Sequence, residues 1–144
     1  MSYDASRALD GGLVFTYTQA QKGCSHTLGG EANPWWKAAL AKSYVITKVR
    51  VHPRVDSSWQ NGKYNNVTVS VSKDDKIWTQ CASLGSTLNT ATGFVDATCQ
   101  AGTAGKYVKI TLQQNGVLAI CEVEAHGYEL VVGKYSWSNA CYNY

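Results

Sequence analysis

Short runs in which apolar and polar residues alternate dominate the chain from Tyr44 onward. Alternation with a period of two places every second side chain on one face, which is typical of a half-buried β-strand. The clearest runs are residues 45–51, 67–71 and 108–112. Clusters of turn-forming residues separate the runs, at 59–62, 73–76, 100–102 and 113–116. We therefore expect an all-β chain folded as an antiparallel β-sandwich.

One segment has a different pattern. Residues 36–42 are rich in helix-forming Ala, Leu and Lys, but Pro34 precedes them and Ser43 and Tyr44 follow, which leaves room for two turns of helix at most. We interpret this segment as a strand or a short turn. The 144 residues show no internal repeat or linker, so we place residues 1–144 in a single domain.

The composition and charge of the chain argue against several classes of protein. Hydrophobic residues make up 44% of the chain and charged residues 16%, which excludes a disordered protein. The apolar runs are far shorter than the roughly 18 residues of a membrane-spanning helix, so no transmembrane segment is expected. The net charge is +3 with the basic residues scattered singly, which gives little support to nucleic-acid binding.

The five cysteines indicate an oxidising compartment. They stand at positions 24, 81, 99, 121 and 141, and no two form a Cys-x-x-Cys pair. This usage favours disulfides and a secreted, extracellular protein. Because five is odd, at most two bridges form within the chain, and one thiol is left free or paired with another chain, which leaves a homo-oligomer open.

Catalytic motifs are missing from the sequence. It has no Gly-x-Ser-x-Gly elbow, no His-Glu-x-x-His, no phosphate-binding loop and no recognisable pair of catalytic carboxylates. We therefore expect no enzyme. His52 and His126 fall in or near strand patterns and are interpreted as structural. His26 differs because it closely follows Cys24 in a glycine-rich, polar loop, where a disulfide would fix its position.

Five short motifs, taken in order, carry a family resemblance. They are Gly23-Cys24-Ser25-His26-Thr27, Asn33-Pro34-Trp35-Trp36, Arg54-x-Asp56, Gly105-Lys106-Tyr107-Val108 and Cys121-Glu122-Val123-Glu124. Over roughly residues 5 to 128 the chain resembles the F-type lectins (fucolectins), a fucose-binding family. The resemblance implies a discoidin-like jelly-roll sandwich of about eight strands. It also implies a lectin that binds L-fucose on fucosylated glycans and glycoproteins through a shallow loop site.

The resemblance assigns the sugar-binding residues position by position. His26 matches the family's site histidine, and Arg54 with Asp56 matches its Arg-x-Asp motif. Lys63 matches the second basic residue if residues 59–62 contain a two-residue insertion. An arginine fork, a lysine ammonium and a histidine ring nitrogen can converge on neighbouring sugar hydroxyls. The alternative is that Arg54 and Asp56 form only a surface ion pair.

Other predicted sugar contacts come from nearby loops. Ser57 and Ser58 occupy the place where many family members carry adjacent bridged cysteines that pack against the sugar. Trp59 replaces that apolar platform by stacking on the ring, and Tyr17 lies in an equivalent loop. A fucose ring needs such an aromatic wall for its apolar edge and methyl group.

Disulfides and a calcium site also follow from the resemblance. It implies disulfides between Cys24 and Cys121 and between Cys81 and Cys99, and it gives no bridging partner for Cys141. For calcium it implies the carboxylates of Asp10 and Glu122, a donor set that suits a hard cation. The expected carbonyl ligands come from Arg7, Gly12, Gly23 and Cys121. The alternative is a capped turn without a metal.

The order of the segments differs from that of the family. Its members usually open with a strand around a Gly-Lys pair, whereas this chain begins near the Asp10-Gly11 turn and carries Gly133-Lys134 close to its end. We interpret this as a circular permutation in which residues 130–144 supply the first strand. A truncated second repeat is the alternative. A discoidin-like module that binds phospholipid or mediates protein adhesion, without sugar binding, is the alternative function.

Overall fold

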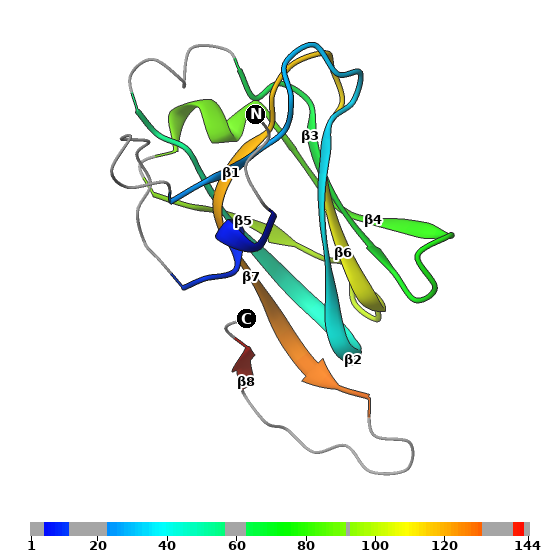
Figure 1. The fold of residues 1–144 in the computed structure, drawn as a ribbon. Helices are drawn as coiled ribbons and strands as arrows, with labels where there is room; N and C mark the ends of the chain where they lie inside the picture. Colours follow the sequence, from blue (N-terminus) through cyan, green and yellow to red (C-terminus); the bar gives the residue numbers. More distant parts are fainter. Residues whose placement is uncertain (1–4, 12–22, 57–62, 92, 131–139, 143–144) are drawn as a thin grey trace.

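The computed structural model describes residues 5–11, 23–56, 63–91, 93–130 and 140–142. Within these ranges the structure is almost entirely β (Figure 1), as the alternating pattern predicts, and no helix is long and apolar enough to cross a bilayer. The elements are η1 (Ala5–Ala8), β1 (Ser25–His26), β2 (Trp35–Pro53), β3 (Val67–Ser72), β4 (Trp78–Gly85), η2 (Thr87–Thr90), β5 (Val95–Thr98), β6 (Ala104–Leu112), β7 (Ala119–Glu129) and β8 (Ala140–Tyr142).

Strand β2 spans 19 residues and takes part in both layers of the fold. Its first part pairs antiparallel with β6, and its second part pairs with β7 and β5. A register shift between Ala39 and Tyr44 marks the change of partner. One layer therefore has the order β2-β6-β3-β4 and the other the order β1-β7-β2-β5, with β8 also paired to β7 (Figure 1). Strand β2 joins the two layers into one sheet of eight strands. This arrangement confirms the predicted antiparallel sandwich.

The core lies between the two layers and is filled by the apolar faces of the alternating strands. Val67, Val69 and Val71 of one layer are at most 2% exposed, and Val49 and Val51 of the other are fully buried. These residues belong to one continuous hydrophobic cluster. The period-two pattern therefore predicted the buried face of each of these strands.

Two disulfides cross-link segments of the sandwich. Cys24, just before β1, is bridged to Cys121 of β7 across 97 residues, and Cys81 of β4 is bridged to Cys99 across 18 residues. Both pairings are those implied by the family resemblance. Closing such loops restricts the unfolded chain, which stabilises the fold by about 4–5 and about 3 kcal/mol respectively, as upper limits.

The end of the chain returns to the sheet. Residues Ala140–Tyr142 form β8, which pairs antiparallel with Ala125–Gly127 of β7. The segment predicted to supply the permuted strand, Leu130–Ser138, lies outside the described residues except for Leu130. The permutation therefore stays a prediction.

Candidate functional site

His26 is held in place on both sides. Cys24, two residues earlier, is bridged to Cys121, and His26 itself pairs with Ala119 in the antiparallel register of β1 and β7. The imidazole Nδ1 lies 2.9 Å from the carbonyl oxygen of Thr27. Because a carbonyl can only accept, Nδ1 is the donor, and Nε2 of the neutral ring is an acceptor.

Arg54 follows the last residue of β2 and contacts the same residue of β7. Its backbone N–H donates to the carbonyl of Ala119 at 3.3 Å. Its side-chain Nε donates to Oδ2 of Asp56 in a close ion pair, in which the Arg54 side chain is 13% exposed and that of Asp56 is 19% exposed. Asp56 therefore fixes the orientation of a partly buried guanidinium that carries four further N–H donors.

Lys63 is exposed, but the backbone beside it is anchored. The next residue, Tyr64, is fully buried, and its hydroxyl donates to the carbonyl of Ala119 at 2.8 Å. Asn89 bonds to the backbone of Tyr64 on both sides of its Cα: its Oδ1 accepts from Tyr64 N–H at 2.8 Å, and its Nδ2 donates to the Tyr64 carbonyl at 3.0 Å. The start of the Lys63 side chain is thus fixed relative to β7.

Ala119 is the point at which the three segments meet. It pairs with His26, and its carbonyl accepts hydrogen bonds from Arg54 and Tyr64. Since β7 lies between β1 and β2 in the sheet, the backbones of His26 and Arg54 are about 10 Å apart, two strand spacings. The structure therefore gathers His26, Arg54, Asp56 and the base of Lys63 at one end of the sandwich.

The sequence did not reveal the residues that do this positioning. Tyr64 and Asn89 are far from each other along the chain and carry no motif, and Ala119 acts through its backbone. The only local signal was that Tyr64 directly follows Lys63. The other predicted sugar contacts, at positions 17, 57, 58 and 59 (Tyr17, Ser57, Ser58 and Trp59), lie outside the described residues.

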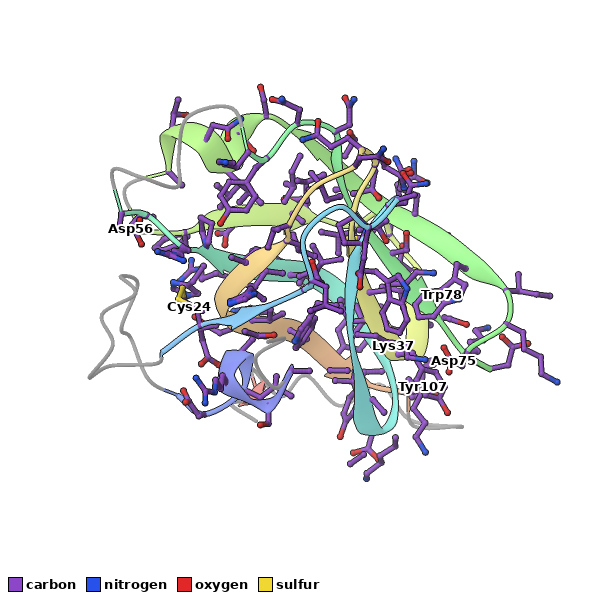
Figure 2. All side chains as sticks on the ribbon, turned by 45° about the horizontal axis from the view of Figure 1, so that its top comes forward. Cys24, Lys37, Asp56, Asp75, Trp78 and Tyr107 are labelled. Carbon is purple, nitrogen blue, oxygen red and sulfur yellow. A yellow bond between two sulfur atoms is a disulfide. The ribbon has the colours of Figure 1, made fainter. Side chains whose placement is uncertain are left out.

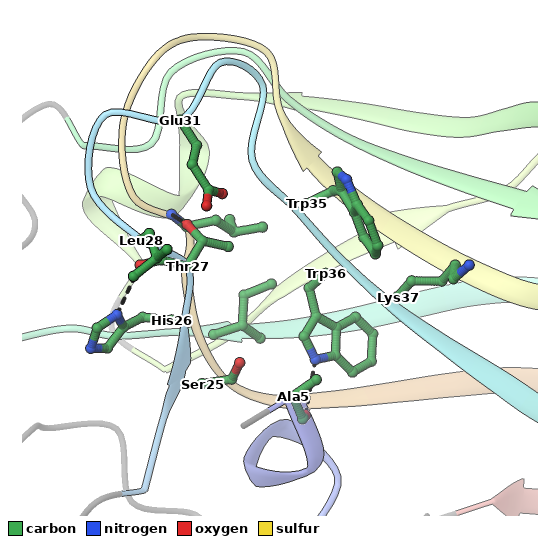
Figure 3. Close-up of a pocket in the computed structure, with 11 residues that line it drawn as sticks. Ala5, Ser25, His26, Thr27, Leu28, Glu31, Trp35, Trp36 and Lys37 are labelled. Atoms are coloured by element: carbon green, nitrogen blue, oxygen red, sulfur yellow. Dashed lines mark hydrogen bonds between the residues drawn. The ribbon is translucent and has the colours of Figure 1, made fainter. Parts of the chain in front are cut away.

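A cavity of about 260 Å³ adjoins the histidine. Figure 3 shows His26 toward one end of it and Trp35 and Lys37 toward the other, with Trp36 between them. Trp36 is only 4% exposed, and its Nε1–H donates to the carbonyl of Ala5 at 3.0 Å, which holds η1 against β2. The hollow therefore runs from the predicted site histidine to the start of β2.

Two of the residues predicted to hold calcium, Asp10 and Glu122, lie near each other. The N–H of Gly11, which has φ of 71°, donates to Oε2 of Glu122 at 3.1 Å, so the turn after η1 packs against β7. The disulfide between Cys24 and Cys121 holds Gly23 close to this point. Arg7 and Asp10 belong to the same N-terminal segment as Gly11, whereas Gly12 lies outside the described residues.

Glu122 is a buried carboxyl group, 4% exposed. Its pKa is raised to about 7, mainly by burial and also by the negative charges of Asp10 and Glu124, while the hydrogen bond from Gly11 opposes the shift. A hard cation would neutralise the two neighbouring carboxylates. Within the described residues no group of three or more His, Cys, Asp and Glu is arranged to hold a metal.

The other two histidines share one carboxylate. His52 Nε2 lies 2.8 Å from Oε1 of Glu124, and His126 Nε2 lies 3.2 Å from Oε2. His52 is buried, at 4% exposed. Both therefore have a structural setting on β2 and β7, as the sequence indicated, and the Glu124 carboxylate is their common partner.

Comparison with known proteins shows which family the chain belongs to. The NedA-like, galactose-binding domain family, of the F5/F8 type C class, matches residues 7–110. Fucolectin from Anguilla anguilla is 31% identical over 126 residues, which cover 85% of this chain and 76% of the relative. The chain belongs to the fucolectin family of discoidin-like domains. Fucolectin-6 from Anguilla japonica is 30% identical over 123 residues, and the chain spans only 62% of its length.

Solved structures support the fucolectin fold. The lectin domain of lectinolysin, determined in complex with Lewis B antigen, is 26% identical, has a TM-score of 0.70, and is matched over 88% of this chain and 85% of its own. A fucolectin from the serum of Morone saxatilis (striped bass) also has a TM-score of 0.70, at 24% identity, over 88% of this chain and 42% of its own. The predicted discoidin-like fold is thereby confirmed.

Proposed function

We propose that this fucolectin-family chain is a lectin that binds L-fucose and fucosylated glycans through His26, Arg54 and Lys63. The observation that carries the proposal is the convergence of the three segments on Ala119, which places two cationic side chains and an imidazole at one end of the sandwich. The relatives named as fucolectins, and the lectin domain solved with Lewis B antigen, support it.

Each side chain has a distinct part in this proposal. Arg54, oriented by Asp56, donates a planar set of N–H groups to adjacent hydroxyls, and Lys63 donates from a rotatable ammonium. His26 accepts at Nε2, because its Nδ1 donates to Thr27. Hydrogen bonds that involve a charged group contribute about 1.5–3 kcal/mol each before the cost of removing water from the sugar is subtracted. Trp59 and Tyr17 are proposed as the aromatic contacts to the apolar edge.

We propose that a bound calcium ion stabilises the segment that carries His26. Asp10 and Glu122 would supply carboxylate oxygens, and Arg7, Gly12, Gly23 and Cys121 would supply carbonyls. The bound ion would tie the N-terminal segment to the bridged pair Cys24–Cys121, two residues from His26. Its role is structural: it would hold β1 in place and would not contact the sugar.

We also propose that the protein acts outside the cell and binds glycans without catalysing a reaction. Two disulfides suit an oxidising compartment. We propose fucosylated glycans and glycoproteins as partners, and a glycan array probed in calcium-containing buffer tests this. Binding confined to fucosylated structures is the expected result. Binding to phospholipid vesicles without any glycan signal would instead favour the membrane-adhesion alternative.

A further inference from the structure

A second hollow lies on the outer face of the layer β2-β6-β3-β4. Its volume is about 280 Å³, and it is lined by Trp35, Lys37, Asp75, Trp78 and Lys109. Figure 2 shows Lys37, Asp75 and Trp78 together on one side of the molecule, opposite the side that carries Cys24 and Asp56. We call these five lining residues the tryptophan groove.

The sheet register explains why these side chains meet. Lys37 of β2 is directly opposite Lys109 of β6, and Lys109 is in turn opposite Ser70 of β3. Side chains alternate between faces along a strand, so Lys37 and Lys109 point outward while their neighbours Trp36 and Ile110 enter the core. The same alternation leaves Trp35 outside, where it is 55% exposed although it is a large apolar residue.

The groove combines aromatic surfaces with excess positive charge. Lys109 Nζ lies 4.0 Å from the ring centroid of Trp78, and Lys37 Nζ lies 5.6 Å from that of Trp35. Lys37 also pairs with Asp75 Oδ2 at 2.5 Å, which balances its charge. Two lysines and one aspartate give the five residues a net charge of one positive unit. In the described part of the chain Lys109 has no carboxylate within ion-pair distance, so its charge is the one that is not balanced.

One wall of the groove is preformed by the turn between β3 and β4. Ser72 Oγ accepts from the N–H of Asp75 at 3.0 Å and donates to the carbonyl of Ile77 at 2.6 Å. Asp74 Oδ1 accepts from the N–H groups of Lys76 and Ile77, both at 2.9 Å. These bonds hold Asp75 in its left-handed conformation, with φ of 63°. A ligand that contacts a preformed wall loses less binding energy to ordering of the protein.

We propose that the tryptophan groove binds an acidic sugar residue, a pyranose that carries a carboxylate or a sulfate group. The indole of Trp35 or Trp78 would face the C–H side of the ring, Lys109 would pair with the anionic group, and Asp75 and Lys37 would hydrogen-bond the hydroxyls. The volume lies at the lower end of known ligand pockets, about 300 Å³, which fits one sugar ring. The groove shares Trp35 and Lys37 with the cavity that adjoins His26, but none of its five lining residues is a proposed fucose contact, so the proposal does not depend on fucose binding.

The test is a titration of the ¹⁵N-labelled full chain followed through the tryptophan indole N–H signals, assigned with Trp35→Phe and Trp78→Phe. Methyl β-glucuronide, glucose 6-sulfate and neutral methyl β-glucoside are compared at equal concentrations. We expect at least one acidic sugar to shift the Trp35 and Trp78 signals at millimolar concentration, and the neutral sugar to leave them in place. The acidic sugar that binds more tightly identifies the preferred anion.

Matched variants and a competitor complete the experiment. Lys109→Gln should weaken acidic-sugar binding at least fivefold, whereas Lys76→Gln, which removes the same charge from the neighbouring turn, should change it less than twofold. Saturating L-fucose should not displace the acidic sugar. An equal response to the neutral glucoside, unchanged affinity in Lys109→Gln, displacement by fucose, or no shift with either acid would each overturn the proposal, whether or not the chain binds fucose.

Discussion

The backbone amide of Gly11 donates a hydrogen bond of 3.1 Å to Oε2 of Glu122, although 111 residues separate the two in sequence. This bond brings Asp10 and its turn against a carboxyl group that is almost fully buried. The negative charge of the exposed Asp10 makes ionisation of Glu122 less favourable unless a cation compensates. Because Glu122 directly follows Cys121, the Gly11 bond also connects the N-terminal turn to the disulfide near His26.

Calcium should raise the melting temperature of the protein. An ion that binds only the folded state stabilises it by about 2.7 kcal/mol at 100 times its dissociation constant, which for a domain of this size corresponds to about 5–10 °C. Scanning calorimetry with calcium and with chelator measures the shift. Glu122→Gln, which keeps the shape of the side chain but removes its charge, should abolish most of it. Superimposable melting curves for the wild-type protein would contradict the calcium proposal.

Asp56 should act on sugar binding through Arg54. Asp56→Ala removes the partner that orients the guanidinium, so we expect fucose affinity to fall about 3- to 10-fold, or about 0.7–1.4 kcal/mol. Asp96→Ala, on β5, is the matched control, because it removes the carboxylate that pairs with another arginine, Arg50 of β2. Titration calorimetry with L-fucose measures both. Equal losses in the two variants would show that Asp56 has no specific role.

The ion pairs of Asp96 should contribute an acid-sensitive part of stability. Hydrogen bonds from Arg50, at 2.8 and 3.1 Å, and a contact with Lys48, at 3.2 Å, lower the pKa of Asp96 from 3.8 to about 2. The stabilisation is therefore complete above pH 4 and is lost as the pH falls through about 2. Allowing for solvent screening, it is at most about 2 kcal/mol.

Urea unfolding of the wild-type protein and of Asp96→Asn between pH 5 and pH 2 tests this expectation. The difference in unfolding free energy between the two proteins should shrink as the pH falls, because the variant lacks the titrating group. A difference that stays constant over this range, or grows toward low pH, would show that the pairs with Arg50 and Lys48 do not stabilise the fold.

Removal of the C-terminal tail should damage the fold. β8 pairs with Ala125–Gly127, and residues 130–144 are expected to supply the permuted strand, so a chain ending at Glu129 loses backbone partners along β7. We expect it to aggregate or to melt well below the full chain. Cys141→Ser in the full chain is the control for loss of the thiol alone, and non-reducing electrophoresis shows whether Cys141 links two chains. A monomeric truncated protein that melts normally and binds fucose would favour the truncated-repeat alternative.

The fold was predictable wherever one strand face is buried. Val67, Val69 and Val71 alternate with polar residues, and their burial follows directly from that pattern. The first part of β2 was harder to assign, because residues 36–42 are largely good helix formers. Pairing with β6 overrides that local preference, and the sequence alone does not specify such a long-range partner.

The candidate site residues can be found in the sequence, but the residues that hold them in place cannot. His26, Arg54 and Asp56 stand in motifs that can be read locally, and the structure brings them together. Ala119 and Tyr64 hold them there through a backbone carbonyl and a buried hydroxyl. Those roles arise from strand register and burial, which only the folded chain defines.

Titration calorimetry of L-fucose into the wild-type protein and Arg54→Ala, with Lys106→Ala as a control for the loss of one positive charge, tests the central claim most directly. A single shallow site predicts a dissociation constant of about 10–100 μM for the wild-type protein and the control. It predicts no measurable binding for Arg54→Ala, whose melting curve should show that it is folded. A folded Arg54→Ala protein that binds fucose with unchanged affinity would contradict the assignment of the site.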